Sequence, residues 1–184
     1  MASAADDAAY TAYVAAKLPW LRRVAYLLCQ DWHRADDLLQ TAITKLYMNW
    51  LRAERVGNID GYARTILVNT FLAEQRSPWW KRVVPHRDDL DSATTPTSPA
   101  DLEAILDLRA ALATLPPKQR ATVVLRYYDE LSVLETAEAL GCSTGNVKSQ
   151  TARALASLRQ TLEARNREHP APTLSATHAG GMTP

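Results

Sequence analysis

The sequence lacks any run of 18 or more apolar residues, so it contains no candidate for a membrane-spanning helix. The N-terminal sequence MASAADDAAY is acidic, and it lacks both the basic and the apolar segment of a secretory signal peptide. We therefore expect a cytoplasmic protein with no membrane partner.

Cysteine is scarce, with only Cys29 and Cys142 in 184 residues. The two lie far apart in sequence, and neither belongs to a CxxC motif or has a histidine at metal-ligand spacing. This argues against a zinc site and against a disulfide framework. We expect both side chains to be buried as small hydrophobic groups, and we expect no metal and no cofactor.

Catalytic motifs are also missing. The chain has no glycine-rich phosphate loop and no nucleophile motif. His33, Asp36 and Asp37 could share one side of a helix, but no second histidine cluster completes a metal or acid-base site. The sequence therefore predicts a protein that is not an enzyme.

Alternating strand patterns are absent as well, and apolar residues recur at helical spacing, which predicts an all-α fold. In the first part of the chain we expect a leading helix at residues 6–17 and three main helices after it. Asp31 and Asp60 are the expected N-caps of the second and third main helices. Trp20, Trp32 and Trp50 are expected in the core.

A segment with few aliphatic residues, PHRDDLDSATTPTSPA, divides the chain into two lobes, because it has too little apolar surface to fold alone. Beyond it, Pro116 and Pro117 open one helix, and Ser132 with Glu135 forms a capping box for the next. The expected division is a helical domain at 6–77, an acidic flexible linker at 78–100, a helix-turn-helix domain at 101–164 and a disordered tail at 165–184.

The net charge of +1 averages two regions of opposite sign. Residues 88–107 contain six acids and no base, whereas the only charges in residues 141–159 are Lys148, Arg153 and Arg159. A helix without acids is unusual for a solvent-exposed surface, where both signs normally mix, and it favours nucleic-acid binding.

The stretch SVLETAEALGCSTGNVKSQTARALASLR predicts two helices joined by a tight turn. One side of the second helix carries Asn146, Ser149 and Arg153, with Lys148 and Gln150 beside them. Amide, hydroxyl and cationic groups suit base edges and phosphates, although a solvated face on a helical hairpin is the alternative. The opposite, buried stripe is expected to contain Val147, Thr151, Ala154, Leu155, Leu158 and Leu162.

Two sets of motifs together resemble a known family. The second lobe contains LPPKQRATVVLRYYDELSVLETAEALGCSTGNVKSQTARALASLR, and the first contains DWHRADDLLQTAITKLYMNW followed by YARTILVNTFLAEQR. The segment in the second lobe resembles the promoter-reading C-terminal domain of extracytoplasmic-function (ECF) sigma factors. The segments in the first lobe resemble the N-terminal domain of the same family. The resemblance covers about residues 9–162 and is strongest to the actinobacterial SigE-type subgroup. It implies a sigma region 2-like bundle and a sigma region 4-like helix-turn-helix. The implied function is to join core RNA polymerase, direct it to minus-10 and minus-35 promoter elements and help melt the DNA.

The sequence ADDLLQ resembles the polymerase-binding motif of that family. The resemblance implies that Asp36, Asp37, Gln40 and Thr41 face the clamp helices of core RNA polymerase. Spacing alone places Asp37, Gln40 and Thr41 on one helix stripe, for which a solvated face is the simpler interpretation.

The sequence YARTILVN resembles the helix that reads the minus-10 element. The resemblance implies that Asn69 helps to hold a base flipped out of the nontemplate strand, with Asn58 contributing from the preceding loop. Arg64 and Arg76 are expected to contact phosphates. For Asn69, a helix-surface amide without this role is the alternative.

In the second lobe, the resemblance assigns minus-35 recognition to the helix that contains GNVKS. Asn146 stands where the family more often has threonine, so the base preferred there is open. The expected minus-35 residues are Asn146, Lys148, Ser149, Gln150 and Arg153.

The implied partners are promoter DNA and the clamp helices and flap of core RNA polymerase. An anti-sigma factor clamped over both lobes is a further implied partner, and control through transcription of the factor's own gene is its alternative. The acidic linker is either a simple tether or a segment that occupies a basic channel of the polymerase. The rival interpretation of the whole chain is a dimeric helix-turn-helix regulator, which palindromic operators would identify.

Overall fold

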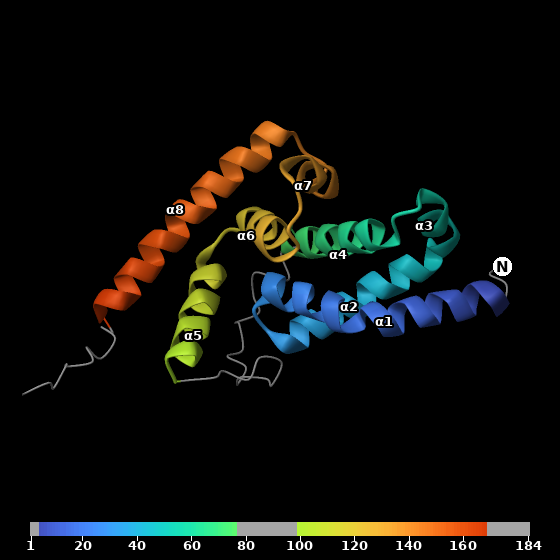
Figure 1. Cartoon of the computed structure of the whole chain (residues 1–184), viewed down its shortest axis with the longest axis horizontal. Coiled ribbons are helices and arrows are strands. Elements are labelled where there is room, and N and C mark those ends of the chain that lie inside the picture. The colour runs from blue at the N-terminus through green and yellow to red at the C-terminus, as the bar shows by residue number, and fades with distance from the viewer. Residues whose placement is uncertain (1–3, 77–98, 169–184) are drawn as a thin grey trace, which may run out of the picture.

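The computed structural model describes residues 4–76 and 99–168, and every element within these ranges is helical (Figure 1), as predicted. The linker at 77–98 and the tail at 169–184 lie outside the described residues. The first lobe consists of α1 (Ala4–Cys29), α2 (Trp32–Met48), α3 (Trp50–Val56) and α4 (Ile59–Arg76). The second lobe consists of α5 (Pro99–Thr114), α6 (Pro117–Val123), the π-helix η2 (Val124–Tyr128), α7 (Val133–Leu140) and α8 (Thr144–Glu168).

The first helix is longer than expected. Where the sequence suggested a leading helix and a separate main helix, α1 continues through Pro19 as one element. A proline inside a helix removes one backbone hydrogen bond, and here tertiary contacts hold both halves in place. Tyr10 donates to the Ile43 carbonyl oxygen at 2.8 Å before the proline. Leu21 and Val24 are buried after it.

One predicted cap of the first lobe is confirmed and one is wrong. Asp31 caps α2 by accepting from the backbone N–H of Arg34 at 2.8 Å. Asp60 lies inside the first turn of α4, where its carboxylate accepts from Lys17 at 2.6 Å. Asn58 takes the capping role instead, because its side-chain oxygen accepts from the N–H of Gly61 at 2.8 Å.

The second lobe follows its local signals, with two corrections at its ends. The capping box of Ser132 and Glu135 is confirmed. The helix α5 already begins at Pro99, inside the expected linker. The helix α8 continues to Glu168, beyond the end expected at residue 164, so residues 165–168 belong to the helix and not to a disordered tail. Arg165 on this added turn pairs with Asp107 of α5 at 2.6 Å, so the turn is in contact with the rest of the lobe.

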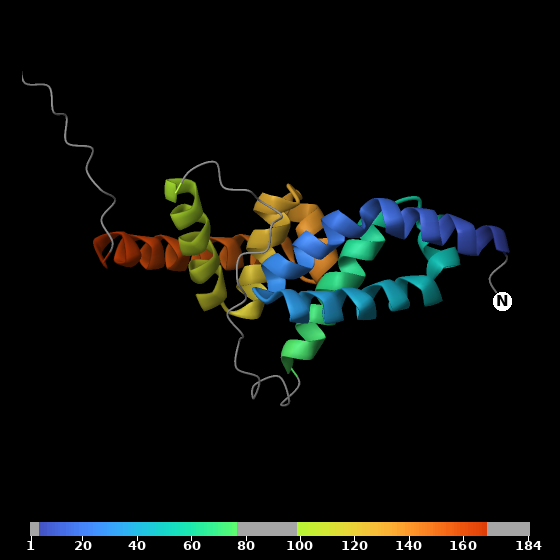
Figure 2. The ribbon, with the colours of Figure 1, turned by 90° about the horizontal axis from the view of Figure 1, so that it is seen from below.

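The two lobes pack together around one core. The largest cluster of buried side chains includes Leu67 and Phe71 of α4 as well as Leu125 and Leu131 of the second lobe. Figures 1 and 2 both show α6 at the junction between the first lobe and the pair formed by α5 and α8. A smaller cluster joins α5, α6 and α8. The lobes are therefore in direct contact in this conformation.

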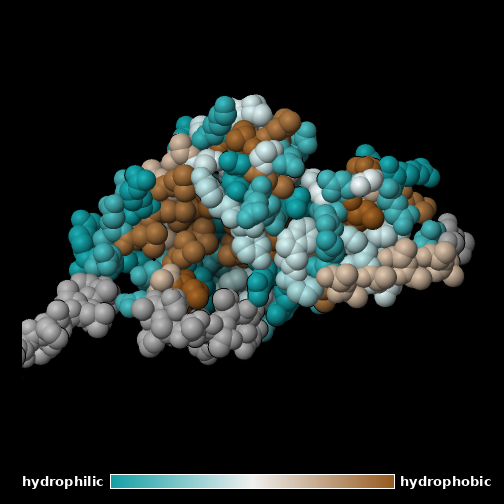
Figure 3. All heavy atoms as spheres, viewed as in Figure 1, coloured by the Kyte–Doolittle hydropathy of each residue, from teal (hydrophilic) through white to brown (hydrophobic). Residues whose placement is uncertain are grey.

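The predicted burial of two tryptophans, of part of the α8 stripe and of one cysteine needs correction. Trp50 is buried as expected, whereas Trp20 and Trp32 are only partly buried against the main cluster. In the predicted buried stripe of α8, Leu155 is 39% exposed, and Thr151 and Leu162 are only partly buried. Figure 3 shows hydrophobic surface in the region where α5 and α8 lie beside each other in Figure 1. Cys142 is half-buried, while Cys29 is buried.

The shared core predicts a large difference between buried and exposed leucines. We expect Leu125→Ala to lower the free energy of unfolding by about 3 kcal/mol, because it removes a fully buried side chain at the junction of the lobes. Leu134→Ala is the matched control, since Leu134 is 60% exposed, and should change it by less than about 0.5 kcal/mol. Urea denaturation followed by circular dichroism measures both, and equal effects would contradict the packing described.

The cysteines predict selective alkylation. Burial raises the pKa of the Cys29 thiol to about 12, so about one thiol in ten thousand is ionised at pH 8. We expect iodoacetamide at pH 8 to modify Cys142 in the folded protein and to reach Cys29 only after unfolding in guanidinium chloride. Peptide mass spectrometry measures both sites. Alkylation of Cys29 in the folded protein as fast as that of Cys142 would show that the site is open.

Candidate nucleic-acid and polymerase interfaces

The exposed side of α2 carries three of the four residues expected at the polymerase surface. Asp37, Gln40 and Thr41 are all exposed. The Thr41 hydroxyl donates to the backbone carbonyl oxygen of Asp37 at 3.0 Å and not to its carboxylate. Asp36 lies differently, because its carboxylate accepts two hydrogen bonds from Arg22 of α1, at 2.7 and 3.1 Å. The helix therefore offers an exposed polar stripe, and Asp36 lies beside it in contact with α1.

A second acid lies close to this stripe. Glu74 of α4 is partly buried, and burial is the main reason that its pKa is raised. The negative charge of Asp37 raises this pKa further, while Arg34 and Lys45 lower it. Sequence reasoning missed Glu74, because only the packing of α4 on α2 brings the two carboxylates together.

Asn69 is exposed at the edge of a pocket of about 290 Å³ between α2 and α4. Tyr62 and Lys45 also line it, and the Lys45 ammonium donates to the Thr70 hydroxyl at 3.0 Å. An amide, an aromatic ring and a cation are groups that bind an unstacked base. The sequence identified Asn69 but not Tyr62 or Lys45, which lie on other turns and another helix.

The remaining minus-10 candidates differ in accessibility. Arg76 and Asn58 are exposed, although the Asn58 side-chain oxygen is used to cap α4. The Arg64 side chain is only 16% exposed, and its Nε donates to Asp129 of the second lobe at 2.7 Å. The structure therefore brings Asn58, Asn69 and Arg76 to the surface of the first lobe and covers Arg64.

The second lobe contains the predicted helix-turn-helix, formed by α7 and α8. Gly141 ends α7 with φ of 59°, a left-handed conformation that favours glycine, and the Ser143 hydroxyl caps α8 by accepting from the N–H of Asn146. Val147 is fully buried and fixes the rotation of α8. Of the predicted minus-35 residues, Gln150 is half-buried and the others are exposed, namely Asn146, Lys148, Ser149 and Arg153.

Asn146 is already engaged inside α8. Its side-chain oxygen accepts from Gln150 Nε2 at 3.3 Å, and its carbonyl oxygen accepts from the Ser149 hydroxyl at 3.0 Å. These contacts link three of the predicted minus-35 residues into one chain along the exposed side. Replacing Asn146 by a residue without a side-chain acceptor would therefore remove a hydrogen bond from Gln150.

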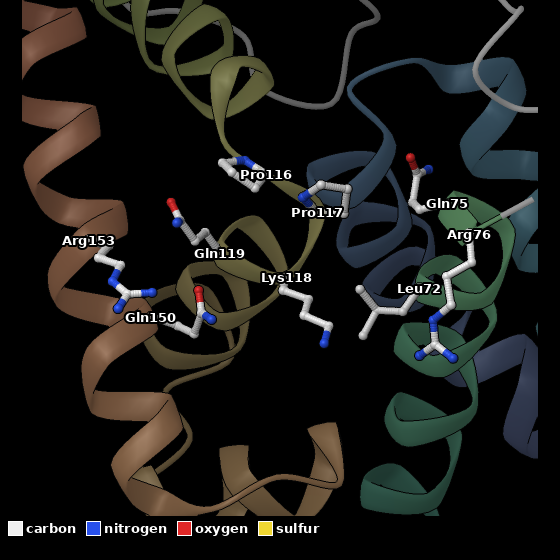
Figure 4. Close-up of a pocket in the computed structure, with 9 residues that line it drawn as sticks. All are labelled: Leu72, Gln75, Arg76, Pro116, Pro117, Lys118, Gln119, Gln150 and Arg153. Carbon is white, nitrogen blue, oxygen red and sulfur yellow. The ribbon is translucent and has the colours of Figure 1, made fainter. Parts of the chain in front are cut away.

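A pocket of about 360 Å³ lies between the lobes (Figure 4). Arg76 from α4 and Gln150 and Arg153 from α8 line it, with Lys118 of α6 between them. Three of its lining residues are basic and none is acidic. Candidate minus-10 and minus-35 residues thus border one positively charged hollow.

Other kinds of site find no support in the part of the chain that the structure describes. Within residues 4–76 and 99–168, no three histidine, cysteine, aspartate or glutamate side chains lie together as a metal site. No helix in these ranges has the length and hydrophobicity needed to cross a membrane.

The chain matches two family models, Sigma-70 region 2 over residues 13–81 and Sigma-70, region 4 over residues 105–158. It is 38% identical over 162 residues to the RNA polymerase sigma-E factor of Streptomyces coelicolor, covering 84% of this chain and 86% of that protein. It is 32% identical to the ECF RNA polymerase sigma factor SigE of Mycolicibacterium smegmatis, covering 76% of this chain and 56% of the relative. The fold resembles the sigma factor RpoE of Bartonella quintana in its co-crystal structure with the anti-sigma factor NepR. That likeness has a TM-score of 0.69 at 24% identity and covers 84% of this chain and 96% of that one.

Proposed function

Because the chain belongs to the ECF group of sigma-70 factors, it directs promoter-specific initiation by RNA polymerase, and we propose how its residues divide this work. The observation that carries the proposal is that one chain holds, on separate lobes, an exposed polar stripe on α2 and an exposed, acid-free side of a helix-turn-helix. The first lobe docks on the polymerase and reads the minus-10 element, and the second reads the minus-35 element.

The polymerase contact is made by Asp37, Gln40 and Thr41 on the clamp helices. These side chains are exposed, and the nearby Glu74 adds negative charge. A carboxylate with an adjacent amide suits the planar donor group of an arginine. Asp36 acts indirectly, since its pairing with Arg22 fixes α1 against α2.

Minus-10 recognition uses the pocket at Asn69. A flipped base would stack on Tyr62 and present its pairing edge to the Asn69 amide, while Lys45 lies within the same pocket. Arg76 and Arg64 would contact phosphates, and Asn58 would contribute from the loop before α4. For Arg64 this requires the second lobe to move, because Asp129 holds it in the conformation described.

Minus-35 recognition uses the exposed side of α8. Asn146 and Arg153 would contact base edges, together with Ser149 and Gln150, while Lys148 would meet the phosphate backbone. We assign residues 6–77 to the first functional domain, 78–98 to the connection and 99–168 to the second domain.

Cellular context follows from this function. Bacterial RNA polymerase works in the cytoplasm, so we place the protein there. An anti-sigma factor is a candidate partner, since a structural relative was crystallised with one. A dimeric helix-turn-helix regulator is not favoured, because the relatives matched across both lobes are sigma factors.

The proposal predicts transcription that depends on added core enzyme. Core RNA polymerase mixed with this protein and a promoter library should yield specific transcripts that are missing when either component is left out. Sequencing of the transcript 5′ ends measures this. A reaction in which the protein adds no specific start sites across the library would reject the proposed function.

The polymerase surface predicts loss of binding on charge reversal. We expect Asp37→Arg to weaken binding to core RNA polymerase by about tenfold or more, because it places a cation against cationic partners. Fluorescence anisotropy of labelled protein measures the affinity, and circular dichroism checks the fold. Glu54→Arg is the control, since Glu54 is exposed on α3 away from the stripe, and it should retain wild-type affinity. Equal losses in both variants would show that net charge, and not the stripe, controls binding.

A further inference from the structure

One polar contact joins the two lobes at a residue that is expected to touch DNA. Asp129, at the end of η2, accepts from Arg64 Nε at 2.7 Å, and the two side chains are 3% and 16% exposed. The indole N–H of Trp20 donates to the other Asp129 carboxylate oxygen at 2.8 Å. Arg64 also lies over the Trp20 ring, 5.3 Å from its centroid. The carboxylate therefore has both its oxygens engaged by the first lobe.

The backbone around Asp129 is unusual on both sides. The preceding residues, Val124–Tyr128, form a π-helix, a rare element that occurs often at functional sites. The following residue, Glu130, has φ of 55°, a left-handed conformation that is strained for a residue with a side chain. Two irregularities in succession point this carboxylate into the first lobe.

Further acids of the second lobe lie around the same surface. Glu130 lines a hollow together with Arg64 and Lys17. Glu135 and Glu138 of α7 line a second one, together with Arg64 and the loop residue Asn58. The pKa of Glu135 is lowered first by its hydrogen bond with Ser132, and Arg64 contributes to the lowering. The edge formed by Asp129, Glu130, Glu135 and Glu138, here called the acidic edge, thus lies beside Arg64 and Asn58 of the candidate minus-10 surface.

We propose that the acidic edge is an internal substitute for DNA phosphates, which occupies Arg64 and covers this part of the minus-10 surface until single-stranded promoter DNA displaces it. The inference rests on the proposed function only in taking Arg64 as a DNA contact. It assigns to Asp129 a regulatory role that is separate from promoter reading.

Competition follows from the chemistry of the covered surface. A guanidinium pairs with a carboxylate or with a phosphate through the same N–H groups, so Arg64 cannot hold both fully. Trp20 is flanked by two cations, Arg64 and Lys17, the latter 5.8 Å from its ring centroid. An aromatic ring between cations is a stacking platform for single-stranded nucleic acid, and Asp129 shields it in the closed conformation.

The test compares the full-length protein with Asp129→Asn. The probe is a fluorescein-labelled pool of random single-stranded DNA 20-mers, because phosphate contacts do not depend on sequence. We expect the variant to bind the pool about tenfold more tightly than the wild type at low salt. Asp107→Asn is the matched control: it also removes one acid from an ion pair, but that pair lies within the second lobe, and its affinity should stay within about twofold of the wild type.

Two more variants separate release of Arg64 from other effects. Trp20→Phe removes the donor to Asp129 without changing any charge, and we expect about threefold tighter binding. Adding Arg64→Ala to Asp129→Asn should cancel most of the gain, because the released cation is then missing. Circular dichroism confirms that each variant is folded. If Asp129→Asn is folded and binds no more tightly than Asp107→Asn, or if the gain survives Arg64→Ala, the proposal is wrong.

Failure of this proposal about the acidic edge can be distinguished from failure of the proposed sigma function. If the wild type supports promoter-specific transcription but Asp129→Asn gains no affinity for DNA, the acidic edge is not a phosphate substitute and the sigma function stands. If Asp129→Asn gains affinity through Arg64 but no promoter-specific transcription occurs with core polymerase, the internal competitor is supported and the sigma function fails.

Discussion

Apolar packing between the lobes is the constraint on which the described conformation depends. Leu125 and Leu131 of the second lobe belong to the same buried cluster as Leu67 and Phe71 of α4, so η2 cannot leave the first lobe without exposing that cluster. Polar contacts across the junction then determine how the helices of the two lobes are positioned against each other. The Arg120 guanidinium donates to the Leu28 carbonyl oxygen at 2.8 Å, which fixes α6 against the end of α1. The covering of Arg64 is therefore a consequence of the shared core and not of one ion pair alone.

Signals that act over a few residues were sufficient to predict much of the fold. The cap at Asp31, the capping box at Ser132 and the helical spacing all depend on neighbours within one or two turns. The cap at Asp60 was a local error, since Asn58 two residues before it takes that role, whereas the two errors in helix length involve residues far apart in the sequence. The helix α1, continuous through Pro19, is bonded to Ile43 of α2, and the extra turn of α8 carries an ion pair that spans 58 residues. A periodic pattern contains no information about such partners.

In the candidate site, too, local features were predictable from the sequence and contacts between distant elements were not. Helix spacing and the family resemblance were enough to identify Asp37, Gln40 and Asn69 as exposed. They could not indicate that Tyr62 and Lys45 share a pocket with Asn69, since that pocket exists only where α2 packs on α4. Nor could they indicate the covering of Arg64, whose partner lies 65 residues further along the chain. For Asp37, Gln40 and Asn69 exposure was predictable from one helix, and the pairing of Arg64 with another element was not.

The energetics of a covered ion pair suit a reversible contact. The free energy needed to remove two charges from water offsets most of the free energy gained from their attraction, so such a pair contributes little net stability while both partners remain. Losing one partner is costly, because the other charge is left buried and unpaired. Exchange of the Asp129 carboxylate for a DNA phosphate avoids that state, since Arg64 keeps an anionic partner throughout. The remaining cost is the exposure of the apolar junction. Docking of each lobe on polymerase and promoter DNA can offset that cost, which would couple opening of the protein to assembly of the initiation complex.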